Sequence, residues 1–159
     1  MTTFARSIEV AAPQAWLFEL MQDYDRRLAW DEFLSKAELV GGAKASALGV
    51  RAWCVDKSGR GMETEYVSFK PPLRVAVKMT RGPWMFHSFA GSWAYRAIDD
   101  ARTEVTFRYN LELRPRLLGK VGDRLLARIF SRDMEQRLAS AKARLERLYR
   151  ESEEAGPNP

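Results

Sequence analysis

Apolar residues recur every three or four positions through the last long stretch of the chain, from Arg116 to Arg150. This spacing places them on one face of an α-helix of about ten turns. Pro115 precedes the stretch, where its fixed φ suits a first helical turn, and Gly156-Pro157 cannot continue a helix. The pattern therefore predicts one long amphipathic helix, which needs an apolar surface to pack against.

The rest of the chain supplies such a surface. Phe4–Val10 alternates as a strand does, Pro13 then begins a short helix, and a second short helix or turn follows the break at Tyr24-Asp25. Six further strands are predicted, at residues 37–40, 48–56, 62–69, 73–79, 85–98 and 103–113. The last one alternates almost perfectly, which is typical of an antiparallel strand with one face in water.

The order of these elements is strand, two helices, six strands and a long helix. It predicts an α+β fold in which a curved antiparallel sheet of seven strands wraps around the C-terminal helix. We expect a single domain over residues 1–151 and a flexible tail over residues 152–159.

Composition places the chain among globular proteins. Of its 159 residues, 46% are hydrophobic and 30% are charged, and no apolar run approaches the roughly 18 residues of a membrane span. The first residues lead directly into the strand-like pattern, without the apolar core of a signal peptide. The single cysteine, Cys54, excludes an internal disulfide and fits a reducing compartment, so we expect a cytoplasmic protein.

The net charge of +5 belongs to the predicted helix, because residues 114–150 hold eleven basic and four acidic side chains. A solvated helix face is the simplest interpretation. A weak contact with anionic membranes, or with an acidic partner, is a second interpretation. Nucleic acid is not expected as a partner, because the segment has no recognised binding motif and no stacking aromatic residues among its arginines.

Several short motifs occur in an order that points to one family. They are Ile8–Pro13 with Trp16, Tyr24-Asp25 with Trp30–Phe33, Lys70–Leu73, and Gly91–Tyr95 with Arg102–Phe107. In order and spacing the chain, from Phe4 to about Tyr149, resembles the START-like (SRPBCC) superfamily, and specifically its polyketide cyclase/dehydrase and lipid-transport branch. The resemblance implies a helix-grip fold with a cavity between the sheet and the terminal helix. Members of this family bind lipids, sterols, polyketides, quinones or plant hormones there, and some catalyse cyclisation or dehydration. The fold alone does not select among these functions.

Strand alternation and helix spacing predict which side chains face such a cavity. The predicted ligand-binding residues are Trp30, Phe33, Trp53, Tyr66, Met79, His87, Phe89, Trp93, Phe107, Tyr109, Leu118, Leu126 and Phe130. The chain has eighteen aromatic residues, many for one small sheet and helix, and pockets for flat or oily ligands are lined in this way. For each residue alone, ordinary core packing is the alternative.

His87 is the only histidine and the one side chain whose ordinary pKa suits proton transfer near neutrality. If the protein is an enzyme, His87 and Tyr109 are the candidate catalytic pair. A polar residue at a strand end, or a ligand contact, is the alternative for His87. Asp31 and Glu32 are interpreted as capping or solvent-facing residues, and Cys54 as a small buried side chain. One histidine and one cysteine provide no metal cluster, and no cofactor is expected.

The leading hypothesis is therefore a protein that binds, and in one version transports, a hydrophobic small molecule such as a lipid, a polyketide or another aromatic or isoprenoid compound. A polyketide cyclase or dehydratase using the same cavity is the first alternative. A quinone- or lipid-handling protein that docks on anionic membranes through its basic helix is the second. The oligomeric state and the identity of the ligand stay open.

Overall fold

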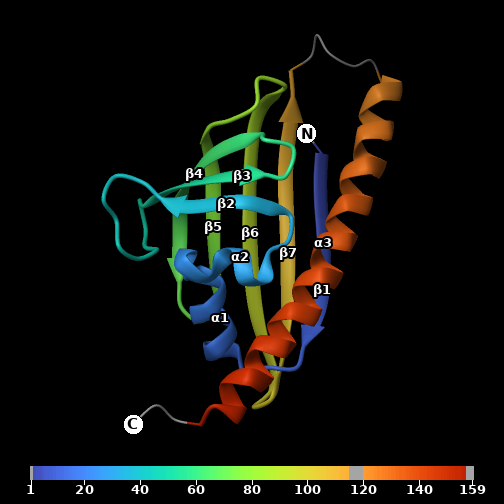
Figure 1. Ribbon diagram of the computed structural model, residues 1–159. Coiled ribbons are helices and arrows are strands. Elements are labelled where there is room, and N and C mark those ends of the chain that lie inside the picture. The colour runs from blue at the N-terminus through green and yellow to red at the C-terminus, as the bar shows by residue number, and fades with distance from the viewer. Residues whose placement is uncertain (1, 115–119, 157–159) are drawn as a thin grey trace.

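The computed structural model describes residues 2–114 and 120–156. In chain order its elements are β1 (Thr2–Val10), α1 (Gln14–Gln22), the 3-10 turn η1 (Tyr24–Arg26), α2 (Arg27–Trp30), β2 (Leu34–Leu39), β3 (Arg51–Asp56), β4 (Gly61–Lys70), β5 (Arg74–Arg81), β6 (Phe86–Asp99), β7 (Arg102–Leu113) and α3 (Lys120–Glu154). Figure 1 shows the curved sheet with α3 running along it and α1 and α2 near one end.

The strands form one antiparallel sheet in the order β1-β7-β6-β5-β4-β3-β2. Each strand from β2 to β7 pairs with its neighbour in sequence, whereas β1 pairs with β7, so that Ile8 lies opposite Val105. The predicted α+β helix-grip fold, with seven antiparallel strands and two short helices after the first strand, is confirmed.

Alternation along β7 creates the apolar concave face of the sheet. Val105, Phe107 and Leu111 are buried, while the intervening residues are partly or fully exposed. β-bulges shift the pairing register in two of the long strands, between Phe86 and Ser88 in β6 and between Tyr66 and Ser68 in β4. Each bulge reverses which residues face inward on one side of it, because side chains alternate with a period of two.

The two short helices close one end of the sheet. α1 begins one residue after Pro13 and buries Leu17, Leu20 and Met21 against the core. Asp23 then leaves the helical conformation, and its side chain accepts a hydrogen bond from the backbone N–H of Asp25, which begins η1. The turn brings α2 and its fully buried Trp30 over the sheet.

α3 packs into the core from Met134 onward, whereas the side chains of Leu125 and Ile129 before it are exposed. Met134, Leu138, Ala141 and Leu145 are buried in the core, as the predicted apolar stripe requires. In the first half, however, Leu125 is 61% exposed, so the stripe does not pack along the whole helix. Of the part of the chain that the structure describes, no helix is long and apolar enough to cross a membrane.

Candidate functional site

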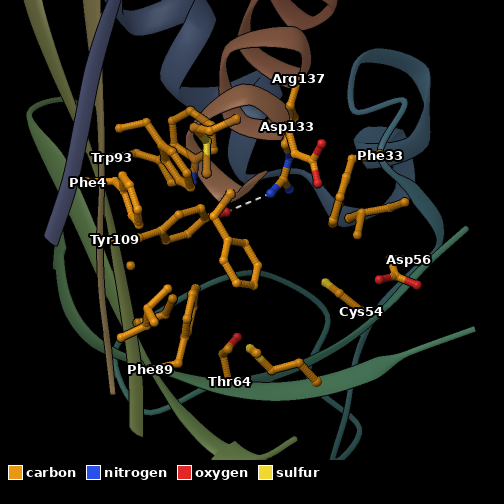
Figure 2. Close-up of a pocket in the computed structure, with 18 of the residues that line it drawn as sticks. Phe4, Phe33, Cys54, Asp56, Thr64, Phe89, Trp93, Tyr109, Asp133 and Arg137 are labelled. Atoms are coloured by element: carbon orange, nitrogen blue, oxygen red, sulfur yellow. Dashed lines mark hydrogen bonds between the residues drawn. The ribbon is translucent and has the colours of Figure 1, made fainter. Parts of the chain in front are cut away.

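A cavity of about 210 Å³ lies between the concave face of the sheet, the α1–α2 segment and α3. Figure 2 shows side chains entering it from opposite sides, with Phe4, Phe89 and Trp93 facing Phe33, Cys54 and Asp56, and Arg137 reaching in from α3. The lining is therefore mixed: aromatic rings dominate the β6–β7 side, and polar groups gather near α2 and α3.

The aromatic wall is continuous across β6 and β7. The ring centroids of Trp93 and Phe107 are 3.8 Å apart, those of Phe107 and Tyr109 are 4.0 Å apart, and those of Tyr109 and Phe89 are 4.8 Å apart. Gly91 allows this packing, because a Cβ at that position would lie only 3.1 Å from Cε1 of Tyr109. The rings meet at tilted or edge-to-face angles and form an apolar aromatic surface, which suits a ligand with rings or an unsaturated chain.

A buried ionic cluster forms the opposite wall. Asp31 is fully buried and accepts two hydrogen bonds from Arg137. Nε of Arg137 lies 3.0 Å from Oδ1 of Asp31, and Nη2 lies 2.6 Å from Oδ2. Arg27 donates to the same carboxylate, with Nε 3.0 Å from Oδ2. Arg137 also donates from Nη1 to the hydroxyl of Tyr109 at 2.6 Å, the bond drawn in Figure 2. Asp31 thus connects α2, α3 and β7.

Burial and pairing with arginine shift the pKa values of the acidic groups in this cluster in opposite directions. Burial by itself raises the pKa of Asp31, but Arg137 and Arg27 outweigh it and lower the pKa to about 2. Burial raises the pKa of Tyr109, and the nearby Arg137 offsets only part of this effect. At neutral pH the cluster therefore holds an ionised carboxylate, two guanidinium groups and a neutral phenol that can donate its hydrogen.

A chain of neutral polar groups continues this wall. The hydroxyl of Tyr66 donates to Oε1 of Gln22 at 2.7 Å, and Nε2 of Gln22 donates to the hydroxyl of Tyr95 at 3.0 Å. Tyr24 and Cys54 also line the cavity, and burial raises the pKa of both side chains. These groups are uncharged at neutral pH, so they supply donors and acceptors without adding charge.

The structure brings most of the predicted ligand-binding residues together. Those that line the cavity are Phe33, Tyr66, Phe89, Trp93, Phe107, Tyr109 and Phe130. They come from β4, β6, β7, α3 and the segment after α2.

His87 is a correction, because its side chain is exposed and does not line the cavity. Strict alternation from Phe89 and Trp93 would turn His87 inward. The bulge between Phe86 and Ser88 breaks that alternation and places Phe86 inside instead. The predicted catalytic pair of His87 and Tyr109 is therefore not assembled.

Four other predicted residues do not line the cavity, and a fifth lies outside the residues that the structure describes. Cys54 and Asp56 on β3 line the cavity, so strand alternation turns Trp53 to the other face of the sheet. There Trp53 is half-buried, with the guanidinium of Arg81 over its ring. Trp30 is fully buried in the core, where its indole N–H has no hydrogen-bond partner among the described residues. The half-buried Met79 and Leu126 are also absent from the lining, and Leu118 lies outside the described residues.

The ionic cluster is the main feature that sequence reasoning missed. The sequence predicts a capping or solvent-facing role for Asp31 and Glu32. Asp31 is instead fully buried, whereas Glu32 is exposed and accepts a hydrogen bond from Ser140. Two signals could have indicated the cluster. Arg27 and Asp31 have the i, i+4 spacing of a helical ion pair. Arg137 interrupts the apolar stripe of α3, one turn from residues that are buried.

Comparison with protein families matches residues 1–146 to the family described as polyketide cyclase / dehydrase and lipid transport. No curated protein gives a significant sequence match. In the part of the chain that the structure describes, no group of three or more His, Cys, Asp or Glu side chains could hold a metal ion.

Solved structures share the fold. The di-domain ARO/CYC BexL from the BE-7585A biosynthetic pathway is similar with a TM-score of 0.77 and 13% identity, over 92% of this chain and 47% of BexL. The chain thus spans about half of that protein. A protein from Thermus thermophilus has a TM-score of 0.74 and 16% identity, over 90% of this chain and 96% of its own. A START superfamily protein from Mycobacterium smegmatis has a TM-score of 0.70 and 10% identity, over 94% of this chain and 97% of its own. At such identities the likeness concerns the fold.

Proposed function

Because the chain belongs to the polyketide cyclase / dehydrase and lipid transport family, we propose that it binds a small hydrophobic molecule, aromatic or isoprenoid in character, between its sheet and α3. Family and fold support hydrophobic-ligand binding or cyclisation in general. The observation that carries the proposal is the cavity itself, with aromatic rings on one side and convergent polar groups on the other.

The size of the cavity favours a compact ligand. Pockets for drug-sized molecules hold roughly 300–1,000 Å³, so a cavity of about 210 Å³ suits one or two fused rings, or part of a chain that leaves through the mouth. Burying about 200 Å² of apolar ligand surface would contribute about 5 kcal/mol at about 25 cal/mol per Å². The costs of association reduce this value, so the bare apolar contact is expected to give binding in the millimolar range or weaker.

Native mass spectrometry of freshly purified protein is the most direct test. We expect a fraction of the molecules to carry a bound small molecule, which extraction and tandem mass spectrometry would identify as a lipid, quinone, polyketide or related compound. A protein that purifies empty, and that takes up no hydrophobic probe, would overturn the proposal.

Filling the cavity should abolish binding. Val77 on β5 lines the cavity, and Val77→Trp places an indole in the space that a ligand would occupy. The affinity for a neutral aromatic probe, 2-naphthamide, is expected to fall at least about tenfold, measured by isothermal titration calorimetry. Val67→Trp is the matched control, because Val67 is 44% exposed and lies outside the lining. An equal loss in both variants, or no loss in either, would place the probe elsewhere.

Catalysis in the same cavity is the second candidate function, and one contact favours it. Arg137 donates to the oxygen of Tyr109, whose own hydroxyl hydrogen has no acceptor among the described residues. That hydrogen is available to polarise a ligand carbonyl, so Tyr109 takes the role that His87 cannot fill. Incubating the co-purified molecule with the protein separates the candidates: an unchanged mass, chromatographic retention and spectrum identify a binding protein, and a cyclised or dehydrated product identifies an enzyme.

Contact with anionic membranes is also proposed, on the basis of the exposed first half of α3. Arg124, Arg128 and Arg132 are exposed at successive i, i+4 positions. Leu125 and Ile129 beside them are 61% and 49% exposed. Basic and apolar side chains on adjacent faces are the pattern of helices that lie at a lipid surface.

Reversing two of these charges should weaken the contact. The double variant Arg124→Glu/Arg128→Glu is expected to bind vesicles of phosphatidylcholine and phosphatidylglycerol at least about tenfold more weakly, at about 1 kcal/mol for each basic residue near the surface. Co-sedimentation at two salt concentrations measures this, and the attraction should fade as salt rises. Arg147→Glu/Arg150→Glu makes the same change of charge at the other end of α3 and serves as the control. Equal binding by both double variants would contradict the docking surface.

A further inference from the structure

The ionic cluster beside the cavity carries an excess of one positive charge. Two guanidinium groups, those of Arg27 and Arg137, share the single carboxylate of Asp31. Arg27 is only 8% exposed, so its charge is poorly solvated by water. An isolated buried cation of this kind is unfavourable unless an anion or strong acceptors surround it.

Arg27 also keeps an unused donor group. Its Nε and Nη2 both lie 3.0 Å from Oδ2 of Asp31. Its Nη1 has no hydrogen-bond partner among the described residues, and the side chain is part of the cavity lining. A nine-tenths buried side chain thus has an unpaired Nη1 and lies in the wall of the cavity, while Trp30 covers the planar face of its guanidinium at 4.6 Å.

The other charges of the lining do not cancel this excess. The carboxylate of Asp56 is occupied by Arg60, whose Nε lies 2.9 Å from Oδ2, and by the backbone and hydroxyl of Ser58. Asp133 lines the cavity from α3, but it is exposed to water, which screens its charge. The surplus positive charge therefore stays at the buried end of the cavity, on the pair Arg27 and Arg137.

We propose that the natural ligand is a monoanionic carboxylic acid with an aromatic or unsaturated apolar body, whose carboxylate binds Arg27. This assignment rests on the proposed function, and it adds the class of head group. A carboxylate matches the planar guanidinium and accepts charge-assisted hydrogen bonds. A single surplus charge favours a monoanion over a phosphate dianion, and the rings of Phe107 and Trp93 accommodate the body.

A matched pair of compounds tests the preference directly. 2-Naphthoate and 2-naphthamide have nearly the same shape and differ in charge, and calorimetry at pH 7 gives both affinities for the unmodified protein. We expect naphthoate to bind at least about tenfold more tightly, because a hydrogen bond to a charged group contributes about 1.5–3 kcal/mol. Equal affinities, or tighter binding of the amide, would overturn the assignment.

Single substitutions test whether Arg27 is the source of the preference for naphthoate. Arg27→Gln should reduce naphthoate binding to the level of naphthamide, while Arg26→Gln, which removes the same charge from the exposed neighbour, should keep the preference. Circular dichroism shows whether Arg27→Gln folds. Asp133→Asn leaves the cluster untouched and, because water screens this exposed carboxylate, should change naphthoate binding by less than about twofold. A preference for naphthoate that survives Arg27→Gln would overturn the role of Arg27, and a large change in Asp133→Asn would mean that the surplus charge is not confined to the cluster.

The outcomes also separate this inference from the proposed function. If both compounds bind equally and Val77→Trp blocks both, the cavity binds hydrophobic molecules without a preference for anions, and only the present inference fails. If neither compound binds and the purified protein carries no small molecule, both proposals fail.

Discussion

Replacing Asp31 by alanine is expected to lower the free energy of unfolding at pH 7 by about 3–5 kcal/mol, because it leaves two buried guanidinium groups without their counter-ion. Arg27 and Arg137 approach the same carboxylate from α2 and α3, so the substitution also removes the link between these helices. Urea denaturation followed by circular dichroism measures the loss. Glu32→Ala is the control, since this neighbouring carboxylate is exposed and its removal should leave the midpoint close to that of the parent.

The ionisation of Asp31 should also make the free energy of unfolding depend on pH. Burial alone would raise the pKa of Asp31, but Arg137 and Arg27 hold it at about 2 instead of 3.8. Because the pKa of Asp31 is lower in the folded than in the unfolded state, its ionised form stabilises the protein at pH values above the unfolded-state pKa. This stabilisation is lost as the pH falls towards the folded-state pKa. The contribution is about 2 kcal/mol above about pH 5 and disappears towards about pH 2. The gap between the parent and Asp31→Ala should therefore narrow in acid, and a constant gap would contradict the pairing.

Leu145→Ala is expected to destabilise the protein by about 2–5 kcal/mol, because it opens a hole in a packed core. Leu145 is fully buried on the half of α3 that packs in the core. Leu125→Ala removes the same atoms from the same helix where the side chain is 61% exposed, and should change stability by less than about 0.5 kcal/mol. Chemical denaturation of both variants checks the comparison, and similar losses would mean that the first half of α3 is packed as well.

The fold could be predicted from the sequence because each of its elements has a strong local signal. The alternation of Val105, Phe107 and Tyr109 identifies a strand with one buried face, and the three- and four-residue spacing from Met134 to Leu148 identifies the helix that covers the sheet. Local patterns and tertiary packing agree over most of the chain, as expected for a sequence that specifies one structure.

The cavity wall was harder to predict, since inward and outward positions depend on register. One extra residue in a bulge is enough to turn His87 outward and Phe86 inward. No local pattern in this segment marks the bulge, because the run Phe86-His87-Ser88-Phe89 is compatible with either parity.

The ionic cluster was hidden for a different reason. Arg137 lies 106 residues after Asp31 in the sequence, and only the folded chain brings these two side chains together. A charged residue next to a tryptophan in a turn is normally at the surface, so Asp31 gave no sign of burial. Buried ion pairs are costly compared with apolar residues of similar size, which favours a role for this cluster in binding over a role in stability.

The pairing of β1 with β7 constrains how the protein is made. Among the described strands β1 pairs with β7 alone, through contacts such as Ile8 with Val105, so β1 must wait until nearly the whole sheet has been synthesised. Contacts across such long sequence separations form only after a large loss of chain entropy, which slows folding. We expect β2 to β7 to assemble first as consecutive hairpins, and β1 and α3 to complete the structure last.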